Sequence, residues 1–209
     1  LEPEQALTLA KRAKKSNFVT FDGLMTYPCG PQTASFVAAA RRLFTEAKID
    51  IPVVSAGGTP EMWRAHEVEG LTEYRVGTSI YNDRHSVGVG SASFDECALH
   101  VHVTVVSLPE PDRGVIDAGS KVLTYDPLPP RYGQGHGHVL EYPEAVITSL
   151  SEEHAVVDFS ACAERPRIGE RLRVVPNHVC PVSNLVDEVV LHRSGVVEAT
   201  VEVAARGKR

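Results

Sequence analysis

The chain has 209 residues, of which 43% are hydrophobic and 23% are charged, proportions typical of a globular protein. Its formal net charge of −6 argues against a nucleic-acid-binding surface, which needs clustered Lys and Arg. No apolar run is long enough to span a bilayer, and four cysteines without paired spacing favour reduced thiols in a cytoplasmic protein. We therefore expect neither nucleic acid nor a membrane among its partners.

The first part of the chain, to about residue 95, alternates helical and strand patterns. Apolar residues recur at helical spacing between residues 32 and 47, which predicts an amphipathic helix. Strands that alternate with helices indicate βαβ units and a parallel sheet. The expected helices span residues 3–15, 32–47 and 60–69, and the expected strands span 18–25, 51–56 and 74–76.

The second part, from about residue 96, reads as strand after strand separated by turn residues. A segment rich in Pro and Gly, residues 126–138, predicts a long loop. We therefore expect an α/β domain over residues 1–95 and a β-rich domain over residues 96–209. The expected strands of this second part are 99–105, 115–118, 146–150, 155–159, 171–175, 185–191 and 197–203.

Two glycine-containing turns follow neighbouring strands of the first part. Gly57, Gly58 and Thr59 lie between a strand and a helix, and Gly77 and Thr78 follow the next strand. Glycine lets the backbone approach an anion, and the amides at the start of a helix favour phosphate. The two turns therefore predict either a phosphate site or simply tight backbone turns.

A histidine and a cysteine, His178 and Cys180, are two residues apart just after an expected strand. On an extended backbone such residues point to the same side. Imidazole and thiolate together form half of a zinc site, and the positions they leave open suit a catalytic metal. The alternative is that two unrelated residues have this spacing by chance.

Short segments along the chain together resemble one enzyme family. They match the D-serine dehydratase and D-threonine aldolase family, metal-activated enzymes that use pyridoxal phosphate (PLP) and have an alanine-racemase-like fold. Each segment is short, but the ordered set extends over essentially the whole chain. The segments are residues 54–60, 74–78, 117–121, 152–154, 176–185 and 204–207.

The resemblance implies the C-terminal part of a (β/α)₈ PLP-binding barrel, followed by a β-rich domain of barrel-like or sandwich-like form. The family's Schiff-base lysine lies on the first barrel strand, for which this sequence has no counterpart. We therefore expect the chain to be the C-terminal portion of a longer enzyme that requires its N-terminal barrel half. Lys121 falls in the β-rich domain and is not expected to be that lysine. The resemblance also implies a homodimer.

The resemblance assigns the glycine-containing turns to the phosphate of PLP. Tyr27 follows an expected strand and is implied to pack on or bond to the cofactor ring, although an ordinary aromatic residue at the rim remains open. Family members often carry an aromatic residue where this chain has Ser79. The implied cofactor-binding residues are Tyr27, Gly57, Gly58, Thr59, Gly77 and Thr78.

His178 and Cys180 match the family's metal ligands, and the His-x-Cys form resembles the dehydratase branch. A thiolate selects zinc over magnesium or manganese, so we expect Zn²⁺ or another divalent metal. His154 is implied to lie near the metal as an acid or base or as a supporting group, and the alternative is a loop histidine without a role. The remaining histidine pairs, expected on a solvated strand face and in a flexible loop, are His100 with His102 and His136 with His138.

These expectations converge on a PLP- and metal-dependent lyase that acts on D-configured β-hydroxy amino acids. Elimination would give a keto acid and ammonia, as in a D-serine dehydratase, whereas retro-aldol cleavage would release an aldehyde, as in a D-threonine aldolase. The His-x-Cys pair favours elimination. The alternatives are a non-catalytic fragment or paralogue that binds metal or phosphate, and an alanine-racemase-like isomerase, which needs no metal.

Overall fold

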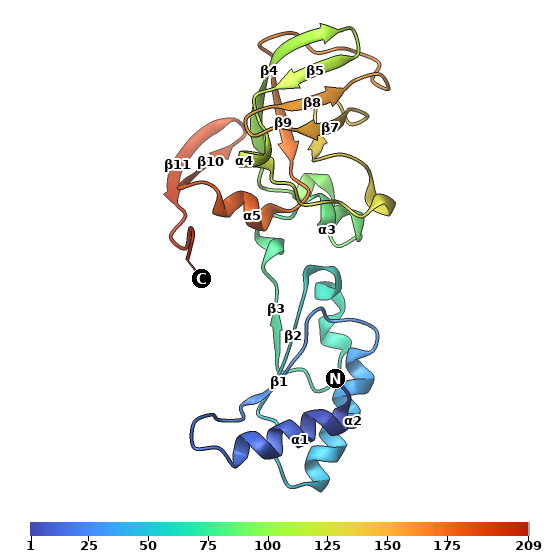
Figure 1. Cartoon of the computed structure of the whole chain (residues 1–209), viewed down its shortest axis with the longest axis vertical. Coiled ribbons are helices and arrows are strands. Elements are labelled where there is room, and N and C mark those ends of the chain that lie inside the picture. Colours follow the sequence, from blue (N-terminus) through green and yellow to red (C-terminus); the bar gives the residue numbers. More distant parts are fainter. Residues whose placement is uncertain (209) are drawn as a thin grey trace. The chain divides into compact units, whose positions relative to one another are not determined.

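A computed structural model describes residues 1–208, which form two compact units that divide between Gly77 and Thr78 (Figure 1). The first unit carries the helices and the parallel strands, and the second is built mainly of antiparallel strands. The change of sequence pattern near residue 95 lies inside the second unit. Among the described residues, no helix combines the length and the apolar character needed to cross a membrane.

The first unit contains a three-stranded parallel sheet in the order β1-β2-β3. The helices α1 and α2 pack on each other and bury a common apolar core with the sheet (Figure 1). Its elements are α1 Pro3–Lys14, β1 Gly23–Met25, α2 Thr33–Glu46, β2 Val53–Gly57, the 3-10 helix η1 Thr59–Glu67 and β3 Glu73–Arg75.

Local sequence explains why these elements form. α1 begins with Pro3 in its first turn, and Gln5 Oε1 accepts a hydrogen bond of 2.9 Å from the backbone N–H of Glu2. α2 buries Val37, Ala40 and Phe44, which recur at helical spacing and form the face turned to the core.

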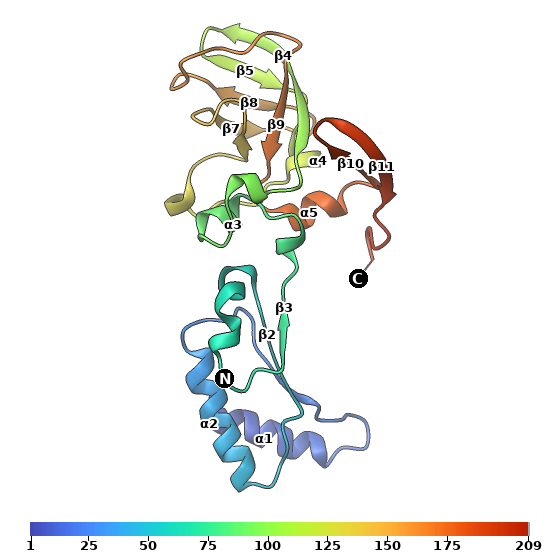
Figure 2. The same cartoon turned by 180° about the vertical axis from the view of Figure 1, so that it is seen from behind.

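The second unit is organised around a six-stranded antiparallel sheet in the order β6-β9-β4-β5-β8-β7. The backbone N–H of His136, just before β6, donates to Ile147 O of β7 at 3.1 Å, so the two edges meet and the sheet nearly closes into a barrel. Figure 2 shows this curved sheet together with the separate hairpin of β10 and β11. The strands are β4 Val101–Glu110, β5 Arg113–Ile116, β6 His138–Val139, β7 Val146–Leu150, β8 Ala155–Asp158, β9 Arg171–Val175, β10 Glu188–Arg193 and β11 Val196–Glu202.

Short helices precede or connect these strands, and the strands enclose one apolar core. The first four residues of β9 alternate, with Leu172 and Val174 buried and Arg171 and Arg173 exposed. The connecting helices are η2 Thr78–Ile80, α3 Arg84–Gly88, η3 Phe94–Glu96, α4 Ser120–Leu123, η4 Pro130–Tyr132 and α5 Val179–Asn184.

The architecture confirms the expected combination of a parallel α/β part and a β-rich barrel-like part, but some elements differ. Residues 18–22 are not a strand, because β1 finds its partner β2 only from Gly23 onward. The helix expected at 60–69 is the 3-10 helix η1, in which Thr59 alone is buried, so no apolar stripe favours an α-helix. The strand expected at 185–191 begins only at Glu188.

The core of the second unit generates a stability prediction. Leu172→Ala removes a side chain that is 0% exposed, and we expect it to lower the free energy of unfolding by about 2–5 kcal/mol. Arg171→Ala, on the exposed side of the same strand, should change it by less than about 0.5 kcal/mol. Urea denaturation of the native protein measures both, and equal effects would contradict the assignment of faces.

Candidate functional site

The expected metal ligands lie at the start of α5 in the second unit. His178 has extended backbone angles, φ −140° and ψ 113°, and is the N-cap residue of the helix, whereas Cys180 already lies within it. The expectation of an extended backbone through both residues is therefore wrong at Cys180. A helix of six residues is too short to be recognised from periodicity.

A carboxylate orients the imidazole of His178. Asp126 Oδ2 lies 2.5 Å from His178 Nδ1, a contact that fixes Nδ1–H as the donor and leaves Nε2 free for another partner. Asn177 holds Asp126 in place, because its Nδ2 donates to Asp126 O at 3.1 Å and to Gly135 O at 2.9 Å. Asn177 is buried, so these bonds are well protected from water.

The thiol of Cys180 is exposed, and its nearest polar partner is the hydroxyl of Thr78. Thr78 Oγ1 and Cys180 Sγ are 3.5 Å apart. The structure thus places a residue expected at the phosphate beside a residue expected at the metal. All four cysteines lie within the described residues and are free, as expected for reduced thiols.

His178 and Cys180 have the donor atoms of a metal site but form only part of one. Imidazole Nε2 and thiolate are good zinc ligands, and a carboxylate on the other ring nitrogen is typical of metal-binding histidines. Within residues 1–208, no cluster of three or more His, Cys, Asp or Glu residues could hold a metal by itself. The pair supplies two donor atoms, so the other positions of a metal site would need water, substrate or another residue.

In the first unit, the carboxyl ends of the parallel strands bring together the other expected residues. Gly58 has a φ of +116°, and a Cβ at this position would lie 3.7 Å from the ring of Tyr27. A Cβ on Gly57 would lie 2.9 Å from Arg75 O, whereas one on Gly77 would meet no atom within 4 Å. Gly57 is therefore required by packing between strands, while Gly77 leaves open space beside the backbone.

The carbonyl of Gly58 is fixed by Tyr74, whose hydroxyl donates to it at 2.6 Å. Burial, with a smaller contribution from Cys29, raises the pKa of Tyr74 to about 12, so this hydroxyl remains a donor at neutral pH. The side chain of Thr59 is buried at the start of η1. Tyr74 belongs to an expected strand, but its role in holding the turn was not predicted.

Sequence reasoning also missed a polar network at this edge of the sheet. Arg75 Nε donates to Ser55 Oγ at 2.9 Å, and Arg75 Nη2 donates to Thr26 O at 2.9 Å. Ser55 Oγ in turn donates to Glu73 Oε1 at 2.5 Å. The alternation of β2 and β3 puts these side chains on one face, but no motif singled them out.

The other residues considered from sequence are distributed over the second unit. His154 is exposed in the turn between β7 and β8, where its backbone O accepts a hydrogen bond of 2.8 Å from Ser151 N. Lys121 Nζ lies 2.5 Å from Glu153 Oε1, and this bond raises the pKa of Lys121. A Schiff-base lysine needs the opposite shift, toward a neutral amine.

The remaining histidine pairs differ from expectation at His138 and His100. His138 is not in a flexible loop, because it belongs to β6 and stacks on Phe94 with ring centroids 3.8 Å apart. Burial lowers the pKa of His100, which is half-buried rather than on a solvated face. His102 is exposed as expected, with its ring against that of His192.

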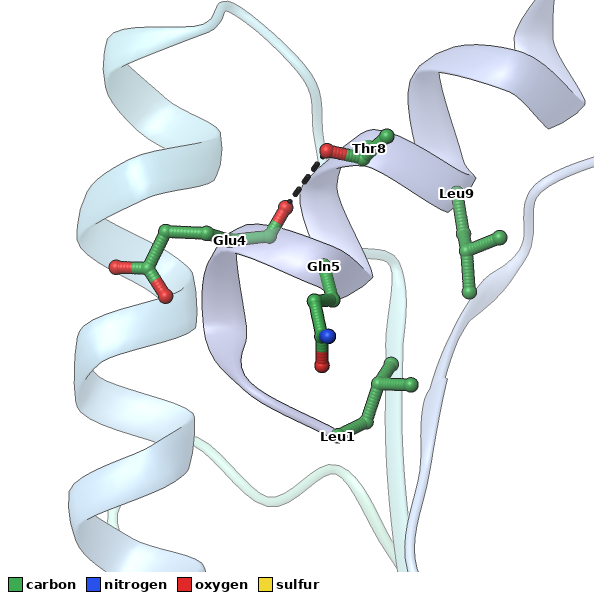
Figure 3. A pocket seen from close by; sticks show the side chains of 5 residues that line it. All are labelled: Leu1, Glu4, Gln5, Thr8 and Leu9. Atoms are coloured by element: carbon green, nitrogen blue, oxygen red, sulfur yellow. Dashed lines mark hydrogen bonds between the residues drawn. The ribbon is translucent and has the colours of Figure 1, made fainter.

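A hollow of about 410 Å³ lies against α1 in the first unit (Figure 3). Its polar groups are engaged locally, since Thr8 Oγ1 donates to Glu4 O at 2.9 Å. It contains none of the residues expected to bind PLP or metal, so we do not assign it a function. The lining residues are Leu1, Glu4, Gln5, Thr8 and Leu9.

Several known proteins are similar to this chain. Residues 98–192 match the family described as putative serine dehydratase domain. A D-threonine aldolase of Arthrobacter sp is 33% identical over 222 residues, which cover 96% of this chain and 55% of that protein. An uncharacterised protein of Mycobacterium tuberculosis is 40% identical over 133 residues, which cover 62% of this chain and 98% of that protein.

Among solved structures, the D-threo-3-hydroxyaspartate dehydratase of Delftia sp. HT23 has a TM-score of 0.71 at 27% identity. The match covers 97% of this chain and 52% of the dehydratase, so the chain spans about half the length of that enzyme, as it does of the aldolase. These findings show that the chain belongs to the D-serine dehydratase and D-threonine aldolase family, which has an alanine-racemase-like fold.

The exposure of the cysteines gives a direct test of the geometry around α5. Because Cys180 is exposed and Cys29, Cys97 and Cys162 are buried, we expect iodoacetamide to alkylate Cys180 first in the native, metal-free protein. Peptide mass mapping over time measures the order. Earlier alkylation of any of the three buried cysteines would contradict the described environment.

Proposed function

We propose that the whole protein to which this chain belongs is a PLP- and metal-dependent lyase of D-configured β-hydroxy amino acids. The observation that carries the proposal is the His178 imidazole held by Asp126, with the Cys180 thiol two residues further along. This pair gives one nitrogen and one sulfur ligand on a fixed support. The family relationship supplies the class of reaction.

Variants of the related dehydratase support the metal assignment. One of its solved structures carries alanine in place of a histidine, and another carries alanine in place of a cysteine two positions further on, in the metal-free form. The spacing of that histidine and cysteine is the spacing of His178 and Cys180. We therefore assign His178 Nε2 and Cys180 Sγ as metal ligands.

The thiolate favours zinc as the metal, because oxygen-preferring ions such as magnesium and manganese bind sulfur poorly. When bound, the metal would act as a Lewis acid toward the substrate's β-hydroxyl. The hydrogen bond between Asp126 and Nδ1 of His178 directs the other ring nitrogen, Nε2, away from Asp126. His154 is the proposed acid or base, since an imidazole ring can both donate and accept a proton.

We assign the phosphate of PLP to the carboxyl ends of β2 and β3. When bound, PLP would supply an electron sink for the reaction. The open space beside Gly77, the positive φ of Gly58 and the buried Thr59 fit close approach of an anion to the backbone. Thr78 follows Gly77 directly, and Tyr27, whose ring lies against Gly58, is the proposed neighbour of the cofactor ring.

Elimination is the reaction we favour, because the dehydratase has a histidine and a cysteine with the same spacing as His178 and Cys180. Retro-aldol cleavage is the second candidate, because the D-threonine aldolase matches 96% of this chain. We further propose that the protein is a homodimer. We also propose a cytoplasmic location, because the cytoplasm keeps thiols reduced and the four cysteines are free. Product analysis of the native gene product with D-serine, D-threonine and D-threo-3-hydroxyaspartate separates the reactions, because elimination releases ammonia whereas cleavage releases an aldehyde.

Removal of each metal ligand tests the metal assignment. We expect His178→Ala and Cys180→Ala to lower the zinc content of the purified native protein and to abolish lyase activity. His154→Ala should retain zinc but lose activity, and His66→Ala, an exposed histidine of η1, should retain both. Elemental analysis together with the product assay measures these outcomes, and a Cys180→Ala protein with full zinc content would overturn the assignment.

Substitutions of two glycines test the phosphate assignment. Gly77→Ala adds a methyl group in open space, so we expect unchanged thermal stability but PLP affinity weaker by about tenfold. Gly57→Ala places a methyl group against Arg75 O, so we expect a loss of stability of about 1–3 kcal/mol. Cofactor absorbance and thermal melts measure both effects, and Gly77→Ala with wild-type PLP affinity would contradict the assignment.

A further inference from the structure

The start of α5 has an unusual N-cap. Helices usually begin with a residue whose side chain accepts one of the free N–H groups of the first turn. His178 occupies this position but makes no capping hydrogen bond, and its imidazole Nδ1 is already engaged by Asp126. The N–H of Val179, the first residue of the helix, donates instead to Asp83 Oδ2 at 3.0 Å.

Asp83 is distant in sequence and belongs to the beginning of α3. It is the N-cap residue of α3, where its Oδ1 accepts bonds from Ser86 N at 2.8 Å and Ser86 Oγ at 2.9 Å. The residue is only 1% exposed. One buried carboxylate therefore caps two helices, one with each oxygen, and it accepts hydrogen bonds from Ser86 and Val179.

The backbone around Asp83 reinforces this connection. Arg84 N donates to Pro176 O at 3.0 Å, and His85 N donates to Asn177 O at 3.2 Å. Together with the bond from Val179 to Asp83, these contacts tie the chain from Pro176 to Val179 onto the first turn of α3. The position of α5 is thus set by α3 rather than by its own sequence.

From this arrangement we propose that Asp83 is a positioning residue for the metal site, since it fixes the peptide group between His178 and Val179, the residue that separates His178 from Cys180. The inference rests on the proposed function of these two residues as metal ligands. A capped first turn holds Cys180 at a defined position relative to His178, so the nitrogen and sulfur ligands are arranged before the metal binds. Without the cap, the first turn of this short helix would fray and the two ligands would no longer hold a fixed separation.

Two substitutions remove the hydrogen bond between Val179 N and Asp83 Oδ2, one by changing the acceptor and the other by removing the donor. Asp83→Asn keeps an oxygen that can cap α3 but presents an amide donor to Val179. Val179→Pro removes the donor itself, at the first helical position where proline is well tolerated, and the extended backbone of His178 suits a residue before proline. Ser86→Ala is the matched control, because it removes one bond to Oδ1 and leaves the bond to Val179 intact.

The experiment is a titration of the native protein, freed of metal, with Co²⁺, whose thiolate charge-transfer and ligand-field bands report on the ligands. We expect Asp83→Asn and Val179→Pro each to weaken Co²⁺ binding by about 10–100-fold and to alter the ligand-field bands. The double variant should bind Co²⁺ about as tightly as the single variant with the lower affinity, because the two substitutions remove the same hydrogen bond. Ser86→Ala should bind Co²⁺ as the wild type does, even if its melting temperature falls.

Three results would overturn the inference. The first is unchanged Co²⁺ affinity and bands in both single variants, with the wild type binding normally. The second is equal weakening by Ser86→Ala, which would indicate general destabilisation. The third is a wild type that binds no Co²⁺ through a thiolate, which would refute the metal site itself. If Asp83→Asn does not fold, the comparison of Val179→Pro with the wild type decides.

Discussion

The conformation of five residues, Pro176 to Cys180, depends on hydrogen bonds to two carboxylates from segments that are distant in sequence. Asp126 accepts a hydrogen bond from the imidazole of His178, and Asp83 accepts one from the following peptide N–H. A buried carboxylate such as Asp83 is stable only when its oxygens are hydrogen-bonded, so its partners are held in turn. This mutual constraint gives an otherwise marginal six-residue helix a fixed beginning.

The β-rich unit provides the rigid support on which this constraint acts. β9, which leads directly into Pro176, lies between β4 and β6 in the nearly closed sheet and buries Leu172 and Val174. The parallel sheet of the first unit supports backbone turns rather than side chains at the carboxyl ends of its strands. One of these turns contains Gly77, which leaves open space beside the backbone.

Features that come from a repeating local pattern could be predicted from the sequence, whereas features that depend on contacts between distant residues could not. The periodicity of α2 and the alternation of β9 depend on neighbouring residues, and both were predicted within one or two positions. Local spacing likewise singled out His178 and Cys180. The helical start of α5, in contrast, depends on Asp83, ninety-six positions earlier, and no local pattern reveals it. Asp126 lies in a loop as expected, but its contact with His178 was not predicted, because the two residues are distant in sequence.

The central claim is that one imidazole and one thiolate of this chain bind the metal, and X-ray absorption fine structure of the zinc-loaded native protein tests it most directly. The account predicts one sulfur at about 2.3 Å and at least one nitrogen at about 2.0 Å from zinc. It also predicts that the sulfur contribution disappears in Cys180→Ala. A coordination shell of oxygen and nitrogen alone in the wild type, or a sulfur that persists in the variant, would contradict the account.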